Sequence, residues 1–191
     1  MKLTELFHLE QQEKPAVPEE PMRPQEALSA AFGLLTRNDI TVLKTLDECF
    51  ADTQKFCLAH MDMLDRRGLQ YSDEAAPWLR MIAAVGAALE QGYLRELHAD
   101  CRPEEFTDAL KALLVTEKIV FSTDKMRFDP HKNLDAWARQ FNEYAGQSGI
   151  TLCFIDLYGD SRIMGVARMA DYAEAAEIAG YAGVTVTSRP D

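Results

Sequence analysis

The segment from Ile150 to Ser188 constrains the fold of this chain more than any other part of its sequence. It starts with an apolar run, Ile150 to Leu157, and continues through turn residues at 158–161 into a partly alternating run, Arg162 to Met169. A nearly unbroken apolar run is typical of a strand covered on both faces, because a strand with one solvated face alternates. The turn between the two runs predicts an antiparallel pair of strands.

A helix and a final strand are predicted after this pair. Asp171 and Glu174 have the spacing of a capping box at a helix start, with Asp in place of the usual Ser or Thr. Gly183 stands where a left-handed residue commonly ends a helix. Val184 to Thr187 is β-branched throughout, which predicts a short last strand. Gly165 lowers one face of the second strand, so we expect the helix to lie close to the sheet.

Two more elements are predicted before the apolar strand. Lys118 to Thr123 is a candidate strand, and Asp129-Pro130 favours a helix start, with Asp as cap and Pro in the first position. The resulting order is that of ferredoxin-like βαββαβ folds. There Ile150 to Leu157 lies at a sheet edge, where an apolar strand invites pairing with other chains. We therefore expect the preceding helices or a second subunit to cover it.

Helical periodicity dominates the chain before residue 117. The predicted helices run from Gln25 to Asn38, from Ile40 to Arg67, from Ser72 or Asp73 to Gly92 or Leu97, and from Pro103 onward. The predicted fold class is therefore α+β, with an N-terminal helical layer followed by a C-terminal ferredoxin-like sheet unit.

Three regions follow from these patterns. Residues 1–24 form an N-terminal arm and Pro-rich spacer, 25–116 a helical region and 117–191 a sheet region, the last two being separate or one compact domain. Prolines recur in the spacer at every third residue, as in a polyproline II segment: Pro15, Pro18, Pro21 and Pro24. The arm can dock on the body or on a partner, and the sequence leaves both open.

Charge and cysteine content narrow the classes of partner. The 191 residues include 31 acidic and 20 basic ones, which give a formal net charge of −11. This balance argues against nucleic-acid or anionic-membrane binding through a basic surface and favours a basic protein partner. Four cysteines without close pairing indicate thiols in a reducing compartment. No long apolar run or signal peptide is present, so we expect a cytoplasmic protein.

One candidate metal site combines two cysteines and two histidines. Cys57 and His60, like His98 and Cys101, are separated by three positions, which places each pair on one helical face. Together they have the composition of a closed tetrahedral zinc site. The alternative, which we favour, is structural: Cys57 and His60 lie on an apolar stripe and belong to a core. On that interpretation there is no cofactor.

A second candidate site lies at the predicted hairpin. Asp156 and Asp160 flank the turn with Arg162 beside them, and paired carboxylates can bind a divalent cation or share a proton. The favoured alternative is that Asp160 shapes the turn and Asp156 pairs with Arg162 or Arg168 across the strands. The common nucleophile, phosphate-loop and zinc-protease motifs are missing, so no catalytic residue is assigned and an enzyme of a familiar class is disfavoured.

A resemblance to known families rests on several short segments. These are Gly92-Tyr93-Leu94 with Glu96-Leu97, Pro103 to Phe106, Trp137, and the apolar strand with Asp156 and Asp160. Over roughly residues 92–188 the chain resembles uncharacterised bacterial α+β domain families, some of which are discussed as immunity proteins of polymorphic toxin systems. Those families often carry an Asp-Trp pair where this chain has His98-Ala99-Asp100. Because those families have no agreed chemistry, the resemblance assigns no catalytic residue to this chain.

Three functional hypotheses remain at this stage. The first is a non-catalytic cytoplasmic bacterial binding protein, immunity-type or regulatory, that acts through an acidic surface. The second is a metal-binding protein or enzyme that uses the Cys/His or Asp residues above. The third is a small-ligand sensor that forms a homodimer through the sheet edge.

Overall fold

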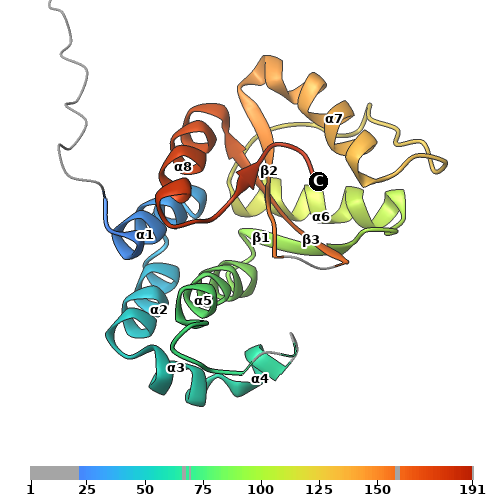
Figure 1. Ribbon diagram of the computed structural model, residues 1–191. Coiled ribbons are helices and arrows are strands. Elements are labelled where there is room, and N and C mark those ends of the chain that lie inside the picture. The colour runs from blue at the N-terminus through green and yellow to red at the C-terminus, as the bar shows by residue number, and fades with distance from the viewer. Residues whose placement is uncertain (1–21, 66–67, 69, 158–159, 191) are drawn as a thin grey trace, which may run out of the picture.

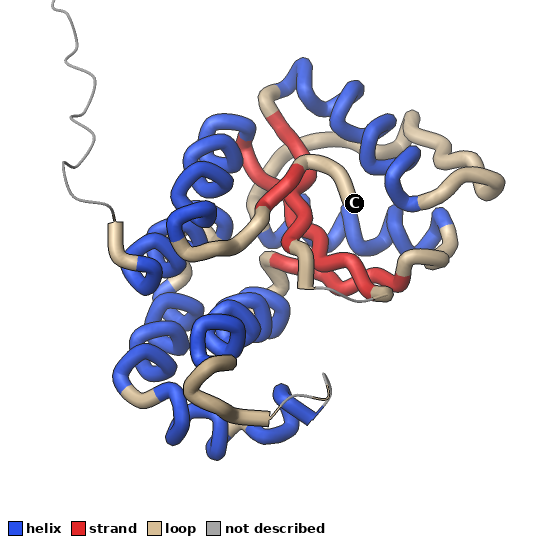
Figure 2. The backbone as a smooth tube through the Cα atoms, viewed as in Figure 1, coloured by secondary structure: helices blue, strands red, loops and turns tan. Residues whose placement is uncertain are grey.

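The computed structural model describes residues 22–65, 68, 70–157 and 160–190 and has a four-stranded antiparallel sheet at its centre (Figures 1 and 2). The strands are β1 (Leu94–His98), β2 (Ile150–Ile155), β3 (Ser161–Arg168) and β4 (Val186–Thr187). Their order across the sheet is β1-β3-β2-β4. The α+β class is therefore confirmed.

Helices cover both faces of this sheet (Figure 1). One side holds α1 (Pro24–Leu35), α2 (Ile40–Ala51), α5 (Ala76–Glu90) and α8 (Met169–Tyr181), and the other holds α6 (Pro103–Thr116) and α7 (Leu134–Ala145). Two short helices, α3 (Thr53–Ala59) and α4 (Met61–Asp65), follow α2, and a 3-10 turn, η1 (Gly146–Ser148), follows α7. Among the described residues, none of the helices is long and apolar enough to cross a bilayer.

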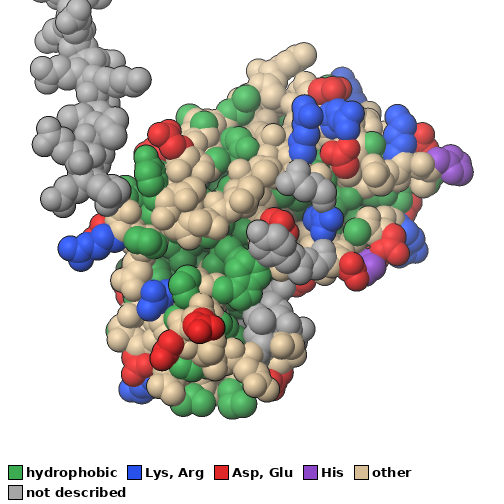
Figure 3. All heavy atoms as spheres, viewed as in Figure 1, with side chains coloured by type: hydrophobic (Ala, Val, Ile, Leu, Met, Phe, Trp, Pro, Cys, Tyr) green, Lys and Arg blue, Asp and Glu red, His purple; other side chains and the backbone are tan. Residues whose placement is uncertain are grey.

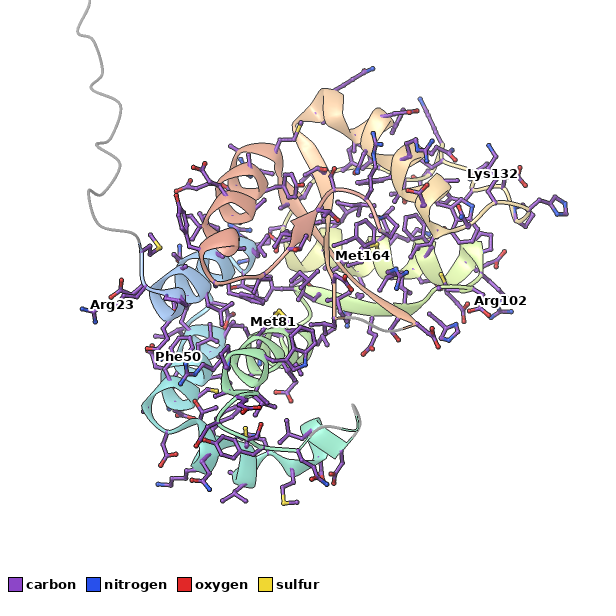
Figure 4. The ribbon with its side chains drawn as sticks, in the orientation of Figure 1. Arg23, Phe50, Met81, Arg102, Lys132 and Met164 are labelled. Carbon is purple, nitrogen blue, oxygen red and sulfur yellow. The ribbon has the colours of Figure 1, made fainter. Side chains whose placement is uncertain are left out.

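The two faces of β2 explain its continuous apolar sequence. Leu152 and Phe154 pack toward α6 and α7, whereas Cys153 and Ile155 pack toward the side of α1 and α8. Because strand side chains alternate, burial on both faces requires every residue to be apolar or small. Met81 and Met164, labelled in Figure 4, belong to these two cores on opposite sides of the sheet.

The edge position predicted for the apolar strand is wrong. β2 pairs with β3 on one side and with β4 on the other, so it lies inside the sheet. The neighbouring strands and the helices on both faces bury β2, as its apolar sequence requires. A dimer formed by pairing along β2 therefore loses its structural basis.

The strand predicted at Lys118–Thr123 is also wrong, because this segment is a loop. Lys118 has a left-handed backbone (φ 52°), and the Ile119 amide donates to the Leu114 carbonyl at 2.9 Å, which ends α6 in a Schellman turn. The loop side chains Ile119 and Phe121 instead pack against the core under α7. The helix predicted from Asp129-Pro130 begins later, at Leu134, with Asn133 as its cap.

The first strand of the sheet lies where the sequence predicted a helix end. α5 stops at Glu90, Gly92 turns the chain with φ 80°, and β1 then pairs antiparallel with β3. The ferredoxin-like βαββαβ arrangement is accordingly not confirmed. Since β1 belongs to the predicted helical region and β3 to the predicted sheet region, the two regions share one sheet. Residues 1–21 of the predicted arm lie outside the described part of the chain.

Other predicted boundaries shift for local reasons. The helix predicted from Ile40 to Arg67 breaks at Asp52, whose side chain accepts from the Lys55 amide at 2.9 Å and so starts α3. The capping box predicted at Asp171 and Glu174 does not form, because α8 already begins at Met169.

The space beside Gly165 was predicted to admit a close helix, but side chains of the neighbouring strands fill it. A Cβ at this position would lie 2.7 Å from the Cys153 Sγ and 2.9 Å from the Leu94 Cδ2, so side chains of the two neighbouring strands occupy the space. The glycine therefore lets β1 and β2 flank β3 closely on this face.

Candidate functional site

The four residues of the predicted zinc site lie in two different parts of the fold. Cys57 is buried in α3, and His60 ends that helix and stacks on Phe56 with ring centroids 4.3 Å apart. His98 ends β1, and Cys101 follows it before α6. Within the described residues, no three Cys, His, Asp or Glu side chains are grouped so that they could hold a metal ion.

The described thiols are in environments that keep them protonated. Burial raises the pKa of Cys57 and Cys101. The same cause raises the pKa of Cys49 to about 11 and that of Cys153 to about 12. Because the thiolate is the reactive and metal-binding form, these cysteines behave as small apolar side chains near neutral pH.

The hairpin end carries a small polar set that is open to solvent. His98 Nδ1 bonds to Asp100 Oδ1, and this hydrogen bond lowers the pKa of Asp100. Ser161 stands opposite His98 in the register of β1 and β3. The His98 side chain is 63% exposed. A serine, a histidine and an aspartate are thus neighbours here, but without the enclosure that strengthens electrostatics in a hydrolytic site.

The two aspartates of the second predicted site, Asp156 and Asp160, are both exposed at this same end of the hairpin. The Asp160 carbonyl accepts from the Ala99 amide at 2.9 Å, which ties the turn to the end of β1. The Arg162 side chain is partly buried, and its Nη1 lies 3.4 Å from the Ser161 carbonyl. These contacts support a structural role of Asp160 and Arg162 at this end of the hairpin, and residues 158–159 of the predicted turn lie outside the described part of the chain.

The described surface carries a groove of about 550 Å³ next to the helical layer. Its walls come from α2, α3, α4 and α5, and β1 contributes Glu96 at one side. The apolar lining consists of Phe56, Leu58, Ala59, Met61, Ile82, Ala83, Ala87 and Leu89, together with Gly86. The polar lining consists of Thr45, His60, Asp62, Glu90 and Glu96. The groove thus combines an apolar wall with carboxylates.

The charged side chains described in the groove lining are all acidic. Asp62, Glu90 and Glu96 are exposed carboxylates, and the lining contains no Lys or Arg among the described residues. Leu58 and Met61 are large apolar side chains that are nevertheless 64% and 53% exposed. Figure 3 shows hydrophobic side chains at the surface over α3 and α4, at the bottom of the view, close to acidic ones. Contiguous exposed apolar patches that are rimmed by polar side chains commonly mark interaction surfaces.

The local sequence explains why the surface is hollow here. On α5, Gly86 and Ala87 come three and four residues after Ala83, so this part of one helical face carries only small side chains. The break at His60 turns the chain from α3 into α4, beside this face. Sequence analysis missed the groove, although the small face of α5 ending in Glu90 was a signal for it.

A second unexpected site is the buried carboxyl group of Glu117 at the end of α6. Only 6% of this residue is exposed, and its Oε1 has no hydrogen-bond partner among the described residues. Burial raises the pKa of Glu117 to about 7, with Arg37 opposing the shift and Asp171 adding to it. A buried polar atom without a partner is rare in proteins and calls for an explanation.

The chain is thus a mixed helix and sheet domain with a groove lined by apolar and acidic side chains. Residues 27–190 match the family described as a domain of unknown function, DUF6630, and the chain belongs to that family. The comparisons gave no match among curated proteins and none among solved structures.

Proposed function

We propose that this protein is a non-catalytic binding protein whose groove takes up a basic, partly apolar segment of a protein partner. The observation that carries the proposal is the groove lining, which joins exposed Leu58 and Met61 to the carboxylates of Asp62 and Glu90. The formal net charge of −11 adds a negative electrostatic field around the whole protein, which also attracts basic partners.

The two kinds of lining residue have separate roles in this proposal. Apolar side chains that leave water on binding contribute about 25 cal/mol per Å² of buried apolar area, so Leu58 and Met61 supply affinity. The carboxylates of Asp62 and Glu90 attract basic side chains, speed association and reject acidic partners. The partner segment is therefore expected to present apolar anchors flanked by Lys or Arg.

The acidic arm of the same chain is a poor occupant by the same reasoning. Residues 1–21 contain five acidic side chains, Glu5, Glu10, Glu13, Glu19 and Glu20, against two basic ones, Lys2 and Lys14. Like charges oppose its docking beside Asp62 and Glu90. The proposed occupant is thus another protein. An immunity-type role in the bacterial cytoplasm is the version of this function in which that partner is a toxin.

The test is affinity capture from a bacterial lysate on the immobilised full chain and two matched variants. Asp62→Lys with Glu90→Lys reverses the groove charge. Glu104→Lys with Asp108→Lys makes the same change of net charge on exposed positions of α6. We expect the wild type and the α6 variant to retain one partner that the groove variant loses and that about 0.5 M salt releases.

Two outcomes would count against the proposal. One is that no salt-sensitive partner is captured. The other is that both variants lose the partner to the same extent, because net charge and not the groove then controls binding.

A further inference from the structure

The C-terminal ends of three helices meet at one place, and each ends in the same type of turn. Arg37 after α1, Gly92 after α5 and Lys118 after α6 have left-handed φ values of 54°, 80° and 52°. In each case the amide of the next residue donates a hydrogen bond to a carbonyl of the preceding helix. The Asn38 amide donates to the Gly33 carbonyl, the Tyr93 amide to the Ala88 carbonyl and the Ile119 amide to the Leu114 carbonyl. These are Schellman turns, two of them without the usual glycine.

Side-chain contacts join the three ends into what we call the three-helix junction, made of residues 36–39, 91–93 and 116–119. Arg37 Nη1 donates to the Glu117 carbonyl at 2.7 Å. The Tyr93 hydroxyl donates to Asp39 Oδ2 at 3.3 Å. The Thr116 Oγ1 lies 3.3 Å from the place where a Cβ on Gly92 would stand.

The Glu117 carboxyl lies inside this junction and interacts electrostatically with charged or titratable groups from several elements. Arg37 comes from the turn between α1 and α2, Asp171 from α8, Tyr93 from the connection of α5 to β1, and Cys153 from β2. Asp39, which faces Tyr93, adds a second acid to this region. Each helix C-terminus also carries a partial negative charge of about half an electron.

The guanidinium of Arg37 is the only described basic group among those that act on the Glu117 carboxyl. Its hydrogen bond goes to the backbone carbonyl of Glu117, and no described residue forms a hydrogen bond with Oε1 of the carboxyl. The closed junction therefore suits a neutral carboxyl better than an ionised one, because an unpaired buried charge is costly.

We propose that Glu117 is a proton-controlled latch that holds the turn between α1 and α2 against the end of α6. When its carboxyl is protonated, the junction is closed as in this structure. When the proton leaves to solvent, the new negative charge lies beside Asp171 and three helix C-termini, and the junction opens to let water reach it. Opening frees Arg37 from the Glu117 carbonyl and loosens the start of α2.

The direction with pH follows from the raised pKa. Burial moves the pKa of Glu117 from its ordinary 4.5 to about 7, so the latch is closed below neutral pH and opens above it. This inference concerns the junction alone and does not depend on the groove function.

Amide hydrogen exchange of the full chain tests the latch at about pH 5.5 and about pH 8.5. Wild type and Glu117→Gln are compared at the same pH, so that the intrinsic chemistry of exchange cancels. At high pH we expect the amides of residues 36–42 and 117–123 to exchange several-fold faster in the wild type. At low pH the two should agree. Glu143→Gln, at an exposed position of α7, should follow the wild type throughout.

A second variant and a direct titration test the proposal even if the Glu117→Gln protein does not fold. Arg37→Asn suits a left-handed backbone and removes the latch donor, so residues 36–42 should exchange fast at both pH values. In the wild type, the carboxyl carbon of Glu117 should titrate near pH 7 by NMR, and the Arg37 amide should follow with the same midpoint. Titration near the ordinary value, or an unchanged pH response in Arg37→Asn, would overturn the proposal.

Discussion

At the scale of single residues, Glu117 makes the stability of the protein depend on pH. Its pKa is raised from 4.5 to about 7 in the folded state, mainly by burial. Between these values the folded state keeps a proton that the unfolded state has lost. The free energy of unfolding therefore falls as pH rises through this window and stays lower above it. A shift of this size corresponds to about 3 kcal/mol.

We expect Glu117→Gln to abolish this contribution. The free energy of unfolding from urea denaturation should decrease between about pH 5 and about pH 8 by roughly 2–3 kcal/mol more in the wild type than in the variant. Glu143→Gln, on the exposed surface of α7, should leave the wild-type dependence intact. Parallel curves for the wild type and Glu117→Gln would mean that Glu117 titrates near its ordinary pKa.

At the scale of elements, Lys118, just after the end of α6, has an unfavourable left-handed backbone conformation. Lys118 is exposed and has a φ of 52°, a conformation that glycine adopts without steric cost. Lys118→Gly should therefore raise the free energy of unfolding by about 0.5–1 kcal/mol. The matched control is Lys111→Gly, in the middle of α6 and also exposed, which should lower it by roughly 1 kcal/mol. Thermal unfolding of both variants measures the difference, and a loss of stability in both would contradict the Schellman turn.

Elements with strong local sequence signals were predicted correctly, and elements without them were not. β2, β3 and α6 carry strong local signals, namely an apolar run, a turn between two runs, and Pro103 followed by acids at a helix start. The strand predicted at Lys118–Thr123 failed because a non-glycine residue ends α6, and the apolar residues beyond it pack as a loop. β1 was missed because its pattern, with Leu94 and Leu97 apolar, also fits a helix.

At the scale of the whole molecule, the groove joins residues from Thr45 to Glu96 that no local pattern connects. Sequence analysis predicted an acidic binding surface without locating it, and that function stays a prediction. The less favoured zinc hypothesis combined Cys57 and His60 with His98 and Cys101 by spacing and composition, but α3 and the end of β1 are separate parts of the fold. Helical spacing places residues on one face of an element, whereas a site depends on how elements pack.

The most direct measurement of the central claim is an NMR titration of the full chain with a short amphipathic peptide of leucine and lysine. We expect saturable binding with shift changes concentrated at residues 58–62 and 86–90, and no binding of the leucine and glutamate counterpart. Reversing the charge at Asp62 and Glu90 should weaken the affinity by about tenfold or more, while the Glu104 and Asp108 reversal leaves it within about twofold. Shift changes spread over the surface, or equal loss in both variants, would contradict a specific acidic groove.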